Sequence, residues 1–137
     1  MEEILRMIES VDPSDTAKLD EIDARVYLFV KNGGWMTRDG VAFYGGEPTM
    51  KSDYPQYTRD RNALKSIRPA LHQWRIYVDY SDLDGGAPSK CEVYISTGTG
   101  LYLEFESKWH YTEELAELHA IIQAINHERK ESDNERE

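Results

Sequence analysis

The chain of 137 residues contains one cysteine, Cys91, and no long apolar run. A single cysteine cannot form a disulfide within the chain, and it excludes a zinc site built from several cysteines. No apolar run approaches the roughly 20 residues that a membrane-spanning helix needs. The first ten residues, MEEILRMIES, lack the basic-then-apolar order of a signal peptide. Because these features suit a reducing compartment, we expect a cytoplasmic protein without a membrane partner.

Positive charge is also scarce. The 16 Lys and Arg residues against 26 Asp and Glu residues give a formal net charge of −10 at pH 7. Proteins that bind DNA or anionic membranes without specificity need a positive field, so the composition argues against broad nucleic-acid binding. An acidic chain can instead dock on a basic partner, although solubility is the simpler explanation of its charge.

Motifs for catalysis and cofactor binding are missing from the sequence. It contains no Gly-x-Ser-x-Gly, P-loop or dinucleotide fingerprint, and no two of its four histidines have the spacing of a helical metal site. Glu104 and Glu106 share one face of a predicted strand and could act as an acid–base pair. Such a row is more often the solvent side of a sheet. We therefore predict a non-enzymatic protein with no cofactor and no metal.

The strongest structural signal lies in residues 74–106, where apolar and polar residues alternate in WRIYVDYS, KCEVYIST and LYLEFES. This period of two, rich in β-branched and aromatic residues, is typical of strands. Glycine-containing turns at residues 84–86 and 98–100 would join the strands into an antiparallel meander. Tyrosines on the second face lead us to expect that both faces are covered.

Amphipathic patterns predict helices over residues 1–10, from Pro13 to about residue 32, over residues 58–68, and from residue 112 onward. We expect Asp12, Thr58 and Thr112 to cap the last three of these helices. Together with the meander, the helices predict an α+β fold, a three-layer α/β/α sandwich. The predicted parts are an N-terminal helical extension at residues 1–18, one sandwich domain at residues 19–127, and a polar, disordered tail at residues 128–137.

Residues 33–57 are the least regular part of the chain, with a small hairpin expected around Asp39-Gly40. Irregular segments in compact domains often carry function. Trp35, Arg38 and Tyr44 are our candidate partner-binding residues. The alternative is that Trp35 and one or two tyrosines simply fill the edge of the core.

A second candidate site is a basic stripe, defined as Arg61, Lys65 and Arg68. Their i, i+4, i+7 spacing places them on one face of the predicted third helix. Such a face could bind phosphate or carboxylate groups, with Tyr54 and Tyr57 stacking on a base. The alternative is an ordinary solvated face paired with acidic side chains of a neighbouring element.

The order of these patterns resembles the phage ABA sandwich domain family. The stretches that carry the resemblance are LDEIDARVYLFVKNGGW, YPQYTRDRNALKSI, the strands with CEVYIST and LYLEFES, and TEELAELHAIIQAI, within residues 19–126. Gly34-Trp35, the segment from Pro55 to Thr58, and Leu115-Ala116 stand at the family's motif positions. The resemblance implies a helix–sheet–helix sandwich and a phage or prophage origin, but no activity.

Three functions follow as hypotheses. The first is a phage accessory protein that binds and inhibits a host protein in the bacterial cytoplasm, for example a defence component. The second is a protein that sequesters a nucleotide signal or another anionic small molecule at the basic stripe. The third is a structural or assembly protein of the phage, and the oligomeric state, including a homo-oligomer, stays open.

Overall fold

The computed structural model describes residues 1–38, 41–49, 54–68, 73–80, 89–96, 102–107, 110 and 112–135. Within these residues the helices are α1 (Glu2–Ser10), α2 (Thr16–Lys31), α3 (Arg61–Ile67) and α4 (Glu113–Glu135). A small sheet contains β1 (Trp35–Met36), β2 (Ala42–Tyr44) and β3 (Glu47–Pro48), and a larger one contains β4 (Gln73–Tyr80), β5 (Ser89–Ser96) and β6 (Tyr102–Glu106). The predicted α+β class is confirmed.

The larger sheet is the antiparallel meander that the alternation predicted, in the order β4-β5-β6. Its register pairs Ile76 with Val93 and Val93 with Phe105, so the apolar positions of the three strands lie side by side. The turns predicted at residues 39–40, 84–86 and 98–100 lie outside the described residues.

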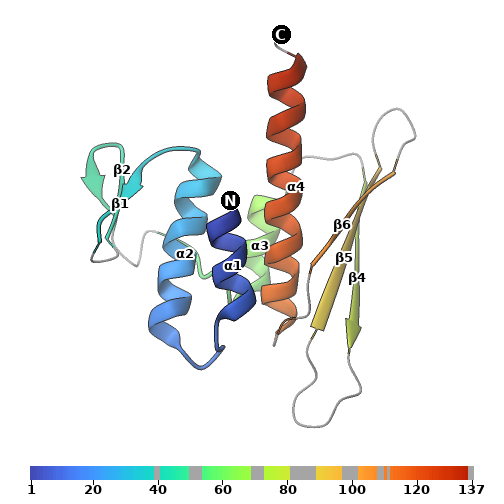
Figure 1. The fold of residues 1–137 in the computed structure, drawn as a ribbon, viewed down its shortest axis with the longest axis horizontal. Coiled ribbons are helices and arrows are strands. Elements are labelled where there is room, and N and C mark those ends of the chain that lie inside the picture. Colours follow the sequence, from blue (N-terminus) through green and yellow to red (C-terminus); the bar gives the residue numbers. More distant parts are fainter. Residues whose placement is uncertain are drawn as a thin grey trace.

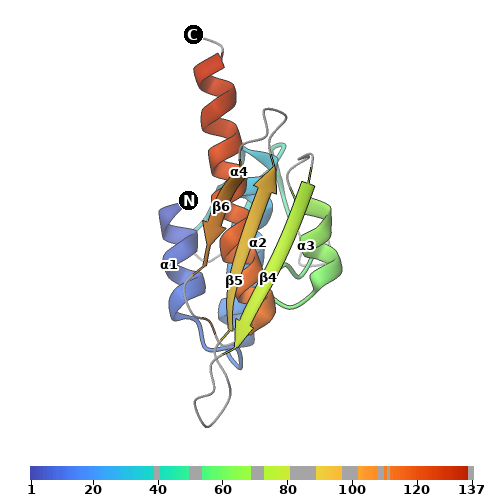
Figure 2. The same cartoon turned by 90° about the vertical axis from the view of Figure 1, so that its right-hand side faces the viewer.

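All four helices lie on one side of the larger sheet, as Figure 1 and the turned view in Figure 2 show. Helix α4 packs directly on this side, where the ring of Phe105 lies 5.5 Å from that of His127. No described element covers the opposite face, so the three-layer arrangement predicted from the sequence is not confirmed. The tyrosines that the sequence pattern places on the second face led us to expect a cover, and the described residues do not supply one.

The described core lies mainly among the helices. Its fully buried side chains come from all four helices and include Ile8, Leu19, Ile22, Leu64, Leu115, Leu118, Ile121 and Ile122. Because Ile4 and Ile8 belong to this cluster, α1 is packed into the same core as residues 19–127. Burying these aliphatic side chains is worth roughly 1.5–3 kcal/mol each.

Two predicted helix starts are wrong. Helix α2 begins at Thr16 rather than at Pro13, because the Asp15 carboxylate accepts a hydrogen bond from the Lys18 N–H. Asp12 instead accepts hydrogen bonds from Ser14 in the turn before the helix. An aspartate side chain can either cap a helix or bond to a turn before it, and the sequence did not indicate which of Asp12 and Asp15 would cap α2.

Helix α3 likewise begins later than predicted, with Asp60 as its N-cap in place of Thr58. The predicted cap of α4 is confirmed, since the Leu115 N–H donates to the hydroxyl of Thr112 at 3.2 Å.

Helix α4 continues to Glu135, beyond residue 127, where the sequence predicted a disordered tail. Arg129 explains part of this extension. Its guanidinium donates to the carbonyl oxygens of Phe29 and Val30 at 2.6 and 3.1 Å and lies 4.5 Å from the centre of the Phe29 ring. The last carbonyls of a helix have no intrahelical donors. The Phe29 carbonyl also accepts the Asn32 N–H at 3.1 Å, so Arg129 of α4 adds a second donor there and ties α4 to the end of α2.

Candidate functional site

The basic stripe on α3 is mostly occupied by a carboxylate of the same protein. Glu117 on α4 is 1% exposed, and its two oxygens accept hydrogen bonds from Arg68 at 2.7 Å and from Arg61 at 3.2 Å. Arg61 also lies 3.1 Å from Glu113. Two of the three cations that could bind an anion therefore tie α3 to α4.

The other members of this candidate site, Lys65, Tyr57 and Tyr54, differ in their exposure and surroundings. Lys65 is exposed on α3. Tyr57 is buried, and its burial, followed by the nearby Tyr27 and Asp23, raises the pKa of its hydroxyl to about 12. Tyr54 is half-buried, with its ring 6.1 Å from that of Tyr27. The structure thus agrees with the alternative in which the stripe pairs with acids of a neighbouring element.

Replacing Arg68 with alanine should lower the free energy of unfolding by about 1 to 2 kcal/mol, because buried Glu117 loses its shorter hydrogen bond. The matched change Lys65→Ala should alter it by less than about 0.5 kcal/mol, since Lys65 is an exposed surface residue. Urea unfolding of both variants measures the difference. If both variants lose the same free energy of unfolding, the pairing of Arg68 with Glu117 does not stabilise the fold.

A second charged network, which the sequence analysis missed, lies between α2 and the start of α3. Asp23 is fully buried and accepts the Thr58 N–H at 2.9 Å and the Arg59 guanidinium at 2.7 Å. The same guanidinium nitrogen of Arg59 lies 2.7 Å from Asp20. The sequence contains a signal for the burial of Asp23, because this residue stands four positions after Leu19 and so shares the apolar side of the helical pattern.

Burial dominates the electrostatics of this network. It raises the pKa of Asp23, and the hydrogen bonds from Arg59 and Thr58 only partly oppose it. Burial alone would lower the pKa of Arg59, but its hydrogen bonds to Asp20 and Asp23 raise it, so Arg59 stays charged. The network fixes the segment before α3 against α2 through the hydrogen bonds of Asp23 to Thr58 and Arg59.

A third polar cluster joins residues that the sequence did not bring together. The rings of His110 and His119 lie 5.0 Å apart, and His119 lies 3.0 Å from Glu9 on α1 and 2.9 Å from Gln123. Among the described residues, no group of three or more His, Cys, Asp or Glu side chains could hold a metal ion. The cluster therefore links α1 to α4.

The small sheet carries an exposed apolar surface at the end of the molecule opposite the larger sheet (Figure 1). We call it the hairpin patch and define it as Trp35, Val41, Phe43 and Pro48. Phe43 pairs with Trp35 on one side and with Pro48 on the other. The rings of Trp35 and Phe43 stack with centroids 4.4 Å apart and planes 4° from parallel, and Trp35 is 58% and Val41 40% exposed.

The other face of the small sheet anchors it to α2. Ala42 is buried, and Tyr44 meets Tyr27 edge-on with ring centroids 6.1 Å apart while staying 40% exposed. Arg38 is exposed after β1. Of the three predicted partner-binding residues, Trp35 and Arg38 are exposed, and Tyr44 combines exposure with anchoring. The sequence did not indicate the partners of Trp35 in the patch, because cross-strand register decides them.

Gly34 holds the small sheet close to α2. Its φ of +84° is in the left-handed region, and a Cβ there would lie 2.3 Å from the Phe43 carbonyl oxygen and 2.7 Å from the Leu28 side chain. Gly34→Ala should therefore displace β1 from β2, while the core of the helices stays folded. Circular dichroism together with hydrogen exchange at residues 35–44 measures both; unchanged exchange would show that Gly34 is not needed to position the patch. The matched change Gly33→Ala meets only Tyr44, at 3.8 Å, and should be mild.

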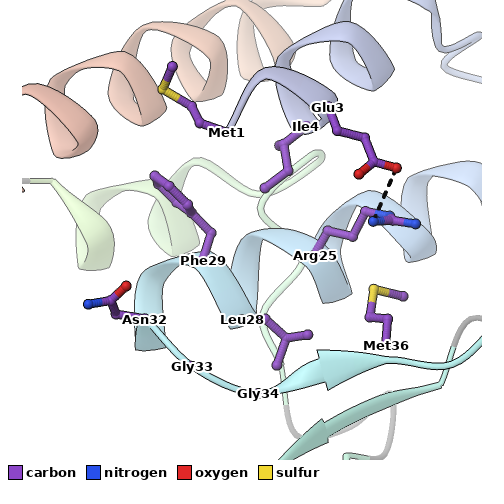
Figure 3. Close-up of a pocket in the computed structure, with 10 residues that line it drawn as sticks. All are labelled: Met1, Glu3, Ile4, Arg25, Leu28, Phe29, Asn32, Gly33, Gly34 and Met36. Carbon is purple, nitrogen blue, oxygen red and sulfur yellow. Dashed lines mark ion pairs between the residues drawn. The ribbon is translucent and has the colours of Figure 1, made fainter.

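An open hollow of about 410 Å³ lies beside the small sheet, between the start of α1 and the end of α2 (Figure 3). Its walls are mainly apolar side chains, Met1, Ile4, Leu28, Phe29 and Met36. Arg25 crosses one wall, 3.4 Å from both Glu3 and Glu21. Because Arg25 already faces two carboxylates, it is not available to pair with an anion in the hollow.

Comparison of the chain with protein-family models, with curated proteins and with solved structures gives no match. The resemblance to the phage ABA sandwich domain family stays a prediction. None of the described helices combines the length and the apolar character needed to cross a membrane.

Proposed function

We propose that the protein is a non-enzymatic binding module that docks on another protein through the hairpin patch. The observation that carries this proposal is the exposure of Trp35 in a stacked pair with Phe43. Contiguous exposed apolar surface is uncommon on soluble proteins, and it often marks a site of protein interaction. Tryptophan is among the residues most enriched at the centres of protein interfaces.

The patch is also held in place before a partner arrives. Stacking on Phe43 restrains the indole ring, and contacts of Ala42 and Tyr44 fix the small sheet to α2. A surface that is already ordered loses less conformational entropy on binding, so more of the contact energy is available for affinity.

The charge of the chain favours a particular kind of partner. With a net charge of −10, two copies repel each other, and the apolar patch itself supplies no charge pair to offset this repulsion. We therefore propose a neutral or basic protein with an apolar pocket for Trp35 and an acidic group near Arg38. If the phage resemblance is correct, this partner is a host protein, and binding inhibits it in the bacterial cytoplasm.

The sequestering function has less support, because Arg61 and Arg68 bind Glu117 rather than facing solvent together. The three-layer sandwich that the phage resemblance implies would require a further layer on the face of the β4-β5-β6 sheet that no described element covers.

Affinity capture with three immobilised proteins tests the proposal: the wild type, Trp35→Ala and Lys65→Glu. A partner should be retained by the wild type and by Lys65→Glu and lost with Trp35→Ala, and the purified partner should reproduce this order. Loss with Lys65→Glu and retention with Trp35→Ala would overturn the proposal in favour of the basic stripe.

A further inference from the structure

Strand β4 is an outer strand of the larger sheet, as Figure 2 shows. Its inner side pairs with β5 over all eight residues from Gln73 to Tyr80. In an antiparallel sheet, every second residue of an outer strand directs its backbone N–H and C=O away from its neighbour. Within the described residues no strand pairs with these groups, and such an edge is a template for another strand.

The sequence of β4 is complementary to itself in the antiparallel direction. A two-fold axis at Tyr77 places Arg75 opposite Asp79 of a second copy, and Asp79 opposite its Arg75. The same register places Ile76 opposite Val78 and Trp74 opposite Tyr80. Opposite charges, β-branched pairs and aromatic pairs are the cross-strand combinations that stabilise antiparallel sheets.

We infer that two copies of the chain associate through β4 into a symmetric dimer with one continuous six-stranded sheet. A two-fold interface requires a surface that complements itself, and this strand meets that requirement. In this register, residues with the same orientation in the pleat face each other, so the helices of both copies lie on the same side of the joined sheet.

The opposite edge of the sheet serves as a comparison within the same molecule. Strand β6, Tyr102–Glu106, contains Glu104 and Glu106 and no basic residue. A two-fold axis at Glu104 would place this carboxylate opposite its own copy, and like charges directly opposite are unfavourable. Charged residues of this kind protect sheet edges from pairing. The edge of β4 is therefore better suited to pair with a second copy than the edge of β6.

The charge pair also explains how copies with a net charge of −10 can associate. Strand β4 has one positive and one negative side chain, so its own net charge is zero. At physiological salt, repulsion between distant charges is screened over about 8 Å, whereas the pairing of backbone groups is local. The dimer is independent of the hairpin patch, which lies at the other end of the molecule (Figure 1).

Sedimentation equilibrium of the full chain in buffer of physiological salt, over a wide range of protein concentration, tests this inference. The wild type should approach twice the 15.9 kDa mass of one chain. Arg75→Asp and Asp79→Arg should each remain monomeric, because each places like charges opposite each other. A mixture of the two single variants should recover a dimer, and so should the double variant, because opposite charges face each other again.

A wild type that stays monomeric at the highest concentration overturns the inference, as do single variants that dimerise as strongly as the wild type. If a variant fails to fold, hydrogen exchange of the wild type alone tests whether β4 forms the dimer interface. Alternate amides of β4 should exchange more slowly as concentration rises, and exchange in β4 that does not depend on concentration would contradict the dimer. Trp35→Ala should dimerise like the wild type, so failure of the proposed docking function would leave this result unchanged.

Discussion

Replacing Asp23 with alanine is expected to lower the free energy of unfolding by about 2 to 3 kcal/mol. The change removes the acceptor of the Thr58 N–H and one of the two carboxylates that hold Arg59, at a position with no exposed surface. A buried N–H without an acceptor keeps the full cost of losing its water. Urea unfolding of the purified variant measures the effect.

The control is Asp23→Asn, which keeps one oxygen for the Thr58 N–H and replaces the oxygen that accepts from Arg59 with an uncharged amide group. Burial raises the pKa of Asp23 above its unfolded value of 3.8, so the neutral form is the better accommodated one. Asp23→Asn should therefore cost less than Asp23→Ala. An equal loss from both variants would assign the effect to the pairing with Arg59 instead of the hydrogen bond from Thr58.

The raised pKa of Asp23 makes the stability of the protein depend on pH. A carboxyl group with a raised folded pKa takes up its proton first in the folded state. As the pH falls through the folded pKa towards 3.8, protonation of Asp23 adds stability, and the amide of Asp23→Asn has no such gain. The wild type should thus become more stable relative to Asp23→Asn in mild acid than at neutral pH; the reverse trend would mean that its ion pair with Arg59 outweighs burial.

Truncating Trp35 to alanine is expected to weaken partner binding by about 2 to 4 kcal/mol, or roughly 30-fold to 1,000-fold. The indole is the largest exposed group of the hairpin patch, and its stacked partner Phe43 stays behind on a surface that has lost half of the pair. Titration calorimetry with the captured partner measures the affinity.

Stability should barely change in the same variant, by less than about 0.5 kcal/mol, because Trp35 is 58% exposed. Weaker binding at unchanged stability would show that Trp35 contributes to partner binding and not to folding. A large loss of stability together with the loss of binding would instead assign Trp35 to the edge of the core, which was the alternative interpretation of the sequence.

Local patterns predicted the helices and the meander correctly because both depend on residues close in sequence. The period of two in residues 74–106 and the stripe of Leu115, Leu118 and Ile122 determine which sides are apolar. Caps were less predictable: Asp12 and Asp15 are both good N-caps, and the geometry of the turn decides between them.

The sequence did not predict side-chain contacts between residues that are far apart along the chain. Glu117 is an acid on a helix, and nothing local shows that it lies inward against Arg61 of another helix and Arg68 just after that helix. In the same way, Trp35 and Phe43 stack only because β1 and β2 pair in one register. Charged and aromatic residues gain their roles from partners far along the chain, so the candidate residues could be named but not placed.

The most direct test of the docking surface is hydrogen exchange of the protein with and without its captured partner. Slower exchange should appear at residues 35–36, 42–44 and 47, with no change over α3. Slower exchange confined to α3, with the small sheet unaffected, would contradict docking through Trp35 and Phe43.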